Sequence, residues 1–235
     1  MILETENLSK SFNGISAIVD LDYQMKDHAL ECIIGPNGAG KTTFFNLLTG
    51  TMKPDQGKII FNGEDITEHK LHEVAKKGLV RKYQSPRVYN GLSVQKNMKI
   101  AATSKSSSNI QERIEDTVEK IRLIDHLEEN AGSLDHGRKQ WLEIGMVLVN
   151  NPKLMLLDEP TAGMTNEETK ETAELIKKIN DTGQSILVIE HDMDFIRSLK
   201  SRITVLHQGQ ILAQGDIDTI EANKTVQEVY IGGES

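Results

Sequence analysis

Short apolar runs recur along the chain, separated by segments in which apolar positions return every three or four residues. The runs rich in Ile, Val and Leu lie at residues 31–35, 58–63, 79–84, 153–159, 185–191 and 203–215. The first, third, fourth and fifth runs lack polar/apolar alternation, which is typical of strands buried on both faces of a parallel sheet. Asn62-Gly63 and Gln208-Gly209 are typical hairpin turns. We therefore expect a parallel core with an antiparallel portion beside it.

Helical patterns lie between these runs, at residues 41–50, 67–78 and 166–183. The first segment ends on Gly50, a residue favoured just after a helix. The second runs from a candidate N-cap, Thr67, to Gly78. The third carries acidic residues in its first turn and lysines later, as the helix dipole favours. Strands that alternate with helices predict an α/β fold class.

The stretch from residue 93 to 150 differs, because it contains no convincing strand. Its apolar residues at helical spacing are Ile110, Ile114, Val118 and Ile121. We interpret it as a helical subdomain inserted into the α/β core, with a polar loop at 103–109. The expected division is 1–92 for the first part of the core, 93–150 for the helical subdomain and 151–235 for the rest of the core.

Composition narrows the class of protein. A chain of 235 residues suits one domain, or one domain with an insertion. Its net charge of -8 argues against a nucleic-acid surface and against adhesion to an anionic membrane. No secretory signal pattern and no long apolar run occurs, so we expect a soluble intracellular protein that meets any membrane through a partner. The lone Cys32 excludes an intrachain disulfide and is expected to be a buried core thiol.

The most specific motif is GPNGAGKTT, residues 35–43. Gly35, Gly40, Lys41 and Thr42 meet the spacing G-x-x-x-x-G-K-[ST], between an expected strand and an expected helix. Glycines let backbone N–H groups close around phosphates at a helix N-terminus. Lys41 is expected to reach the β- and γ-phosphates, and the Thr42 hydroxyl to bind Mg²⁺. The full set of expected nucleotide-binding residues in this loop is Gly35, Asn37, Gly38, Ala39, Gly40, Lys41, Thr42 and Thr43.

A second motif, LMLLDEP at residues 154–160, ends an apolar strand in two adjacent acids. Two carboxylates at the end of a buried strand are costly unless they face a cation or a reaction. We expect Asp158 to hold Mg²⁺, directly or through water, and Glu159 to polarise the attacking water. The alternative is an acid that merely caps the next helix.

These two motifs, followed by His191 in VIEHDM, occur in the order found in the ATP-binding subunits of ABC transporters. The chain resembles that family over nearly its whole length. The resemblance implies a P-loop NTPase (RecA-like) core with an antiparallel β subdomain and an inserted α-helical subdomain. It also implies an ATPase, with ATP and Mg²⁺, whose hydrolysis is coupled to transport. A P-loop kinase and a DNA-repair ATPase are the rivals, and the short helical insert with an ABC-like signature argues against both.

The resemblance assigns three further residues. Gln84, at the end of LVRKYQ, would contact Mg²⁺ and the lytic water, and His191 would donate a hydrogen bond to the γ-phosphate. Phe12 would stack on adenine. The alternatives are solvated strand-end residues for Gln84 and His191, and a core residue for Phe12. The segment AGMTNEE, residues 162–168, stands in place of the usual D-loop, with Thr165 where aspartate is common.

Short segments outside the main motifs resemble particular subgroups of the family and so indicate the solute. The segments LLTG, RKYQ, AGM and EVYIG are similar to the group that serves branched-chain amino acids and related small polar solutes. RKYQSPRVYNGLSVQKNM, HGRKQWLEIGM and LDEPTAGMTNEET resemble the ATP-binding subunits of urea ABC transporters. We therefore expect a urea importer. The alternatives are an importer of branched-chain amino acids or another small polar solute, and a non-transport ABC ATPase.

The resemblance also implies the partners. They are integral membrane permease subunits, a second and non-identical ATP-binding subunit, and a periplasmic or lipid-anchored solute-binding protein, with no nucleic acid. The chain would then lie on the cytoplasmic face of the cell membrane. Each ATP site would be shared between the P-loop of one subunit and the signature of the other.

The signature is where the chain departs most from the family pattern, LSGGQ, because residues 134–138 read LDHGR. Asp135 replaces a serine whose hydroxyl faces the γ-phosphate held by the opposing subunit. Two unit charges about 4 Å apart repel by roughly 4 kcal/mol at an effective dielectric near 20. One hypothesis is that the site completed by this signature is slow or silent. The alternative is that Asp135 turns away and the glycine amides suffice.

Overall fold

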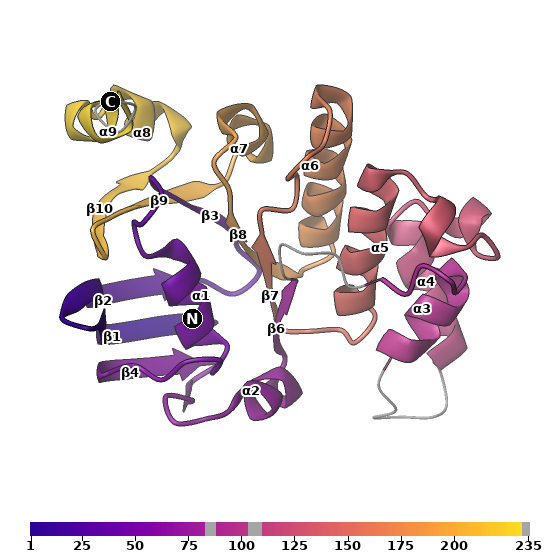
Figure 1. The fold of residues 1–235 in the computed structure, drawn as a ribbon, viewed down its shortest axis with the longest axis horizontal. Coiled ribbons are helices and arrows are strands. Elements are labelled where there is room, and N and C mark those ends of the chain that lie inside the picture. Colours follow the sequence, from indigo (N-terminus) through magenta and orange to yellow (C-terminus); the bar gives the residue numbers. More distant parts are fainter. Residues whose placement is uncertain (83–87, 103–109, 232–235) are drawn as a thin grey trace.

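The computed structural model describes residues 1–82, 88–102 and 110–231 (Figure 1). Its centre is a six-stranded sheet in the order β10-β9-β3-β8-β7-β6. The strands are β3 (Leu30–Ile34), β6 (Leu79–Lys82), β7 (Leu154–Asp158), β8 (Ser185–Ile189), β9 (Arg202–His207) and β10 (Gln210–Gly215). Neighbours from β9 to β6 are parallel, and β10 pairs antiparallel with β9 through the expected turn at Gln208-Gly209. The expectation of a parallel core is confirmed.

Alternate residues of the central strands enter two different cores, which explains why their sequences show no polar alternation. One core contains Leu154, Leu156, Leu187 and Ile189, and the other contains Met155, Leu157, Ile186 and Val188. Cys32 belongs to the second core, where burial raises the pKa of its thiol to about 12. The expectation of a buried core thiol is confirmed.

A second, four-stranded antiparallel sheet has the order β2-β1-β4-β5. Its strands are β1 (Leu3–Phe12), β2 (Ile15–Met25), β4 (Gln56–Phe61) and β5 (Glu64–Asp65). The predicted turn at Asn62-Gly63 joins β4 to β5, with both residues at positive φ. The sequence did not indicate β1 and β2, because irregularities in their register interrupt the alternation of apolar residues.

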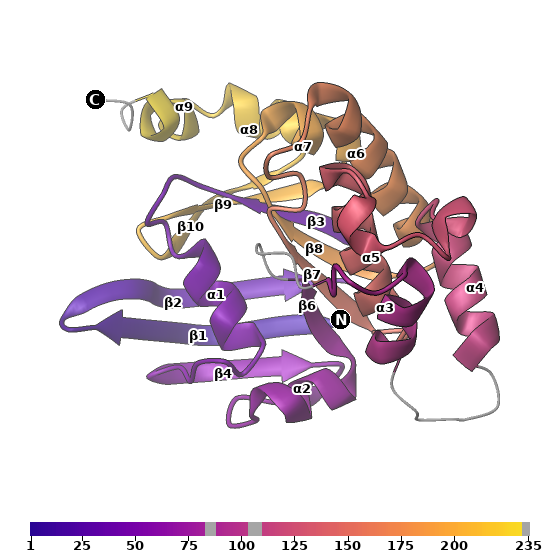
Figure 2. The ribbon, with the colours of Figure 1, turned by 45° about the vertical axis from the view of Figure 1, so that its right-hand side comes forward.

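Helix α1 (Lys41–Leu48) belongs to the core that joins the two sheets. Its Phe44 packs edge-on against Tyr23 of β2, with ring centroids 5.6 Å apart. The other face of the parallel sheet is covered by α5 (His136–Leu148), α6 (Asn166–Asp181) and α7 (Met193–Leu199), as Figures 1 and 2 show. Burial of both faces positions the ends of the parallel strands, where the candidate site lies.

Helices α3 (Val94–Ala101), α4 (Ile110–Lys120) and α5 gather at one end of the molecule, on the right of Figure 1. Within 88–102 and 110–150, the chain forms no strand, apart from one bridge between Ser93 and Asn130. Ile114, Val118 and Ile121 are buried there. The polar stretch 103–109 lies outside the described residues, and the three-part division of the chain stays a prediction.

One helix start was predicted wrongly. Helix α2 (Leu71–Lys77) has Lys70 as its N-cap, and the Lys70 N–H donates to Glu73 Oε2 at 2.7 Å. The Thr67 hydroxyl instead accepts from the Ile59 N–H at 2.9 Å and donates to Asp65. Thr67 closes the β4–β5 hairpin because its hydroxyl finds partners in that hairpin.

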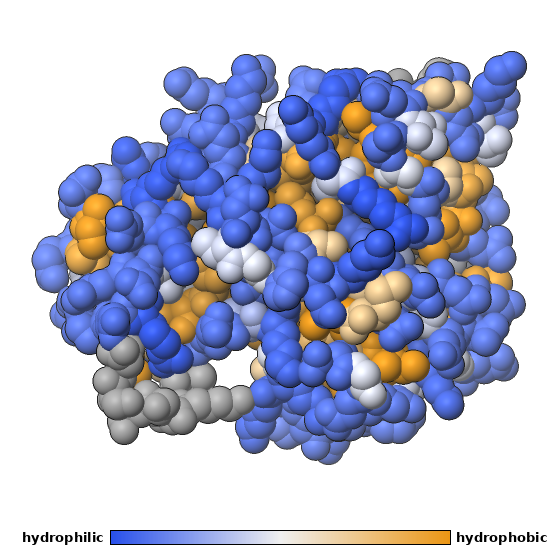
Figure 3. Space-filling model, turned by 180° about the vertical axis from the view of Figure 1, so that it is seen from behind, coloured by the Kyte–Doolittle hydropathy of each residue, from blue (hydrophilic) through white to orange (hydrophobic). Residues whose placement is uncertain are grey.

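The remaining helices, α8 (Ile217–Ala222) and α9 (Lys224–Ile231), follow β10. Figure 3 shows the back of the molecule, where hydrophilic residues cover most of the surface and apolar residues lie in small groups. In the part of the chain that the structure describes, no helix combines the length and the apolar character needed to cross a bilayer.

Candidate functional site

The loop from Gly35 to Gly40 joins β3 to the first turn of α1. Gly40 is the N-cap of α1 with φ +103°, and a Cβ at this position would lie 2.5 Å from the Ala17 carbonyl oxygen. Gly38 has φ +81°. Only glycine adopts these conformations without strain, and in the described chain no side chain caps the N-terminus of α1. The positive end of α1 and the nearby N–H groups form a cradle for an anion.

Lys41 lies over this loop. Its ammonium donates to the carbonyl oxygens of Gly35 and Pro36, the latter at 3.0 Å. Burial lowers the pKa of Lys41, while the carboxylates of Glu159 and Asp158 act in the opposite direction. The ammonium is therefore within electrostatic reach of both strand-end acids.

A cavity of about 440 Å³ opens beside the loop. It is lined by Pro36, Asn37, Gly38 and Ala39, by His207 and Gln208 of the β9–β10 hairpin, and by Glu228 and Val229 of α9. This volume is in the range of small-molecule sites. The hairpin is tied to the loop because the Gly209 N–H donates to the Ala39 carbonyl at 3.0 Å.

The two strand-end acids meet at the carboxyl edge of the parallel sheet. Asp158 is the last residue of β7 and is buried, and Glu159 follows it with φ +44°. Left-handed backbone at a non-glycine residue is uncommon and concentrates at functional sites. The Glu159 N–H donates to the Ile189 carbonyl at 2.9 Å, and its Oε1 lies 3.8 Å from Nδ1 of His191. The structure thus brings Lys41, Asp158, Glu159 and His191 together.

Arg81 of β6 is a residue of this site that the sequence interpretation missed. One end of its guanidinium donates to Asp158 Oδ2, and the other donates to Asn46 Oδ1 of α1 at 2.7 Å. Both charged side chains are almost fully buried, so the guanidinium compensates a carboxylate that burial would otherwise destabilise. The signal was present in LVRKYQ, because two cations in a buried strand require partners.

Lys82, the second of these cations, faces the other way. Its ammonium lies 3.5 Å from Oε2 of Glu143 in α5, and both groups are buried. Burial lowers the pKa of Lys82, and the carboxylate of Glu143 opposes that shift. The pair therefore joins the central sheet to α5 close to the site.

The residues present fit an ATP-bound Mg²⁺. Among residues 1–82, 88–102 and 110–231, no group of three His, Cys, Asp or Glu side chains is placed to hold a metal. Mg²⁺ in nucleotide sites is bound by one or two protein groups together with phosphate oxygens. Thr42 is exposed in the first turn of α1, and Asp158 accepts from Arg81 through its Oδ2.

Two expected site residues do not join this group in the described structure. Gln84 lies outside the described residues, so its roles stay predictions. Phe12 is the last residue of β1 and is 41 % exposed, with the Lys10 ammonium 5.7 Å from the centre of its ring. It is therefore no core residue, while its stacking on adenine stays a prediction.

Asp135 turns toward its own helix. It is the N-cap of α5, where Oδ1 accepts from the Arg138 N–H at 2.8 Å and Oδ2 accepts from Arg138 Nη1 at 2.9 Å. The helix N-terminus and the guanidinium both compensate its charge. This geometry favours the alternative in which Asp135 does not oppose a triphosphate.

We expect Asp135→Ala to lower the free energy of unfolding by about 1 kcal/mol, the usual cost of losing an N-cap, and to lower Tm by about 2–4 °C. Asp135→Ser keeps a capping oxygen and should stay near the parent in thermal unfolding. Asp135→Ser should also keep the parent ATPase rate, whereas the repulsion hypothesis expects that rate to rise. An unchanged Tm in Asp135→Ala would contradict the capping role.

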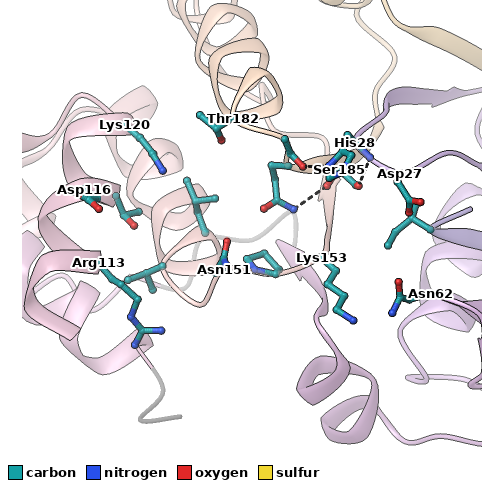
Figure 4. A pocket seen from close by; sticks show the side chains of 17 residues that line it. Asp27, His28, Asn62, Arg113, Asp116, Lys120, Asn151, Lys153, Thr182 and Ser185 are labelled. Atoms are coloured by element: carbon teal, nitrogen blue, oxygen red, sulfur yellow. Dashed lines mark hydrogen bonds between the residues drawn. The ribbon is translucent and has the colours of Figure 1, made fainter. Parts of the chain in front are cut away.

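A larger cavity, of about 580 Å³, lies elsewhere (Figure 4). It is bordered by Lys153 and Ser185, at the beginnings of β7 and β8, and by Arg113 and Lys120 of α4. Ligands of open α/β sheets bind at the carboxyl ends of the strands. This cavity lies at the amino ends, so its size does not make it the nucleotide site.

Comparison with known proteins places these features in one family. A family model described as "ABC transporter" matches residues 18–162. The high-affinity branched-chain amino acid transport ATP-binding protein BraF of Pseudomonas aeruginosa is 32% identical, over 98% of each chain. LivG of Escherichia coli K12, which has the same description, is also 32% identical over 98% of each chain.

Solved structures agree with the sequence comparisons. A nucleotide-free ATP-binding cassette from an ABC transporter superposes with a TM-score of 0.89 and 29% identity, over 98% of this chain and 99% of that one. The ADP conformation of an ABC transporter cassette gives a TM-score of 0.88 and 28% identity, over 98% of each chain. The expected P-loop NTPase fold is confirmed.

Proposed function

Because this chain belongs to the ABC transporter family, we propose that it is the ATP-binding subunit of an importer for branched-chain amino acids. The observation that carries the proposal is the end-to-end similarity to BraF and LivG, both described as ATP-binding proteins of branched-chain amino acid transport. The chain is an ATPase that uses ATP with Mg²⁺. The expectation of urea finds no support in these relatives, which favour its alternative.

The proposed partners follow from the family. We infer permease subunits in the membrane, a second ATP-binding subunit and a solute-binding protein, with this chain on the cytoplasmic face. The signature of the second subunit would close over the P-loop of this chain. The solute itself would contact the other subunits only.

The geometry supports different roles for the residues around the phosphates. The N–H groups of the P-loop and the Lys41 ammonium would bind the β- and γ-phosphates, since both sit at the uncapped start of α1. Thr42 and Asp158 would hold Mg²⁺, which when bound neutralises charge on the phosphates. Arg81 would keep Asp158 oriented.

Glu159, His191 and Gln84 would act on the γ-phosphate and on the water that attacks it. Glu159 would accept a proton from water as that water attacks the γ-phosphorus, and the bond to the oxygen of the ADP leaving group would break. His191 would donate a hydrogen bond to the γ-phosphate from its place beside Glu159. Gln84 is proposed to contact Mg²⁺ and the same water.

Uptake of labelled leucine and labelled urea, in cells with and without this gene, tests the solute. We expect loss of the gene to lower leucine uptake and leave urea uptake unchanged, because the similar proteins serve branched-chain amino acids. The parent gene should restore leucine uptake, and the Lys41→Ala variant should not. Loss of urea uptake alone would overturn the proposed solute, and loss of neither would overturn the proposed importer.

A further inference from the structure

Glu190 is a buried carboxylate at the same edge of the sheet that the mechanism above does not use. It follows β8 directly, precedes His191 and is 1 % exposed. Burying a carboxylate is costly unless hydrogen bonds replace its hydration. The hydrogen-bond partners of this carboxylate therefore indicate its role.

Both oxygens of Glu190 accept hydrogen bonds from loops of the site. Oε1 accepts from the Thr161 N–H at 3.2 Å and from the Thr161 hydroxyl. Oε2 accepts from the N–H groups of His191, at 2.9 Å, and Asp192, at 3.4 Å. One carboxylate therefore ties the segment after β7 to the segment after β8.

These two segments carry the reacting groups. Glu159 lies two residues before Thr161, and the Ala162 N–H returns to the Glu159 carbonyl at 3.3 Å. His191 is held through its own backbone N–H, and its ring Nδ1 lies 3.5 Å from Glu190 Oε2. The Glu190 carboxylate thus adds a second link between these segments, beside the hydrogen bond from the Glu159 N–H to the Ile189 carbonyl.

The segment after β7 also contacts the signature, residues 134–138. The Ala162 carbonyl, next to Thr161, pairs with Nε2 of His136 at 2.8 Å, in the first turn of α5. Burial lowers the pKa of Lys82, and the carboxylates of Glu143 and Glu190 both oppose that shift. The segment after β7, which Glu190 holds at Thr161, therefore also contacts the first turn of α5.

We propose that Glu190 is a positioning residue that holds the side chains of Glu159 and His191 at the separation that hydrolysis requires. The inference rests on the roles proposed above for those two residues. A carboxylate suits this place because each of its oxygens accepts two hydrogen bonds, whereas an amide would turn its own N–H₂ toward two of these donors. The Glu190 backbone N–H donates to the Ile33 carbonyl of β3 at 3.4 Å, but its carboxylate accepts from the segments that carry Glu159 and His191. Loss of the carboxylate charge should therefore influence turnover more than ATP binding.

The test is the ATPase kinetics of Glu190→Gln in the full chain. Misplacement of catalytic groups by about 1 Å costs about 10²-fold, so we expect kcat to fall by about 10- to 100-fold while KM for ATP changes little. Glu31→Gln is the matched control, because Glu31 is equally buried in β3, bonds to Tyr23 and lies at the other end of the sheet. Its kcat should equal that of the parent.

Thr161 variants separate the hydrogen bond from packing. Thr161→Val keeps the shape and loses the hydroxyl donor, so kcat should fall by about 2- to 10-fold. Thr161→Ser keeps the donor and should retain the parent kcat. The reverse order, with Ser impaired and Val normal, would overturn the proposal even if Glu190→Gln fails to fold.

Glu159→Gln measured in parallel separates this inference from the proposed function. Parent-like kcat in Glu190→Gln, together with an inactive Glu159→Gln, would remove the positioning role alone. Parent-like kcat in Glu159→Gln would remove the site assignment on which the inference rests. A rise in KM without a fall in kcat would also overturn it.

Discussion

Glu159→Gln should bind ATP and fail to hydrolyse it. The amide keeps the shape of the side chain but accepts no proton from the attacking water, so turnover should fall by about 10²–10⁴-fold. Lys41 and the P-loop glycines are unchanged, so a fluorescent ATP analogue should bind at least as tightly as to the parent. Because ATP is no longer consumed, the variant should accumulate as an ATP-bound dimer in gel filtration, alone or with its partner subunit.

The control for this variant is Glu6→Gln, which makes the same chemical change at an exposed position of β1. Its phosphate release should match that of the parent. Near-normal hydrolysis in Glu159→Gln would remove Glu159 from the role of general base and would leave its left-handed backbone without a catalytic explanation.

Lys41→Ala should lose affinity for ATP. The substitution removes a charge-assisted contact with the phosphates, which is worth about 1.5–3 kcal/mol and corresponds to roughly 10- to 100-fold in affinity. The carbonyl oxygens of Gly35 and Pro36 also lose the Lys41 ammonium as a donor, while Pro36 still accepts from the Ala39 N–H at 3.1 Å, so the loop itself should become less ordered. Titration of a fluorescent ATP analogue measures the effect.

Lys53→Ala provides the comparison, since Lys53 is an exposed lysine that pairs with Glu68 on the surface. It should bind the analogue like the parent, because exposed ion pairs contribute little. If Lys41→Ala also binds like the parent, the phosphates do not lie where the P-loop predicts.

The conformation of residues 35–40, the candidate nucleotide-binding loop, could largely be predicted from the sequence because the glycine spacing indicates it. The positive φ of Gly38 and Gly40 and the start of α1 at Lys41 are indicated by the motif itself. The Ala17 carbonyl adds a tertiary reason for glycine at position 40. The sequence likewise indicates Asp158 and Glu159, which follow a strand whose apolar run is continuous. Local propensity and packing agree at these positions, so the pattern is sufficient.

The strands β1 and β2 could not be recognised in this way. Their polar residues and irregular register hide the alternation, and only pairing with each other and with β4 makes them strands. Strand propensity depends on neighbours across the sheet, and the sequence does not identify those neighbours.

The partners of the charged groups were decided by the tertiary structure alone. Arg81 and Asp158 are 77 positions apart, and Glu190 and Thr161 are 29 apart. Each pair meets because β6, β7 and β8 lie side by side in the sheet, although helical segments separate them along the chain. The sequence by itself determined which chemical groups reach the carboxyl edge of the sheet. Strand adjacency decided which of them share a hydrogen bond, because a buried charge is satisfied by whichever donor the fold places beside it.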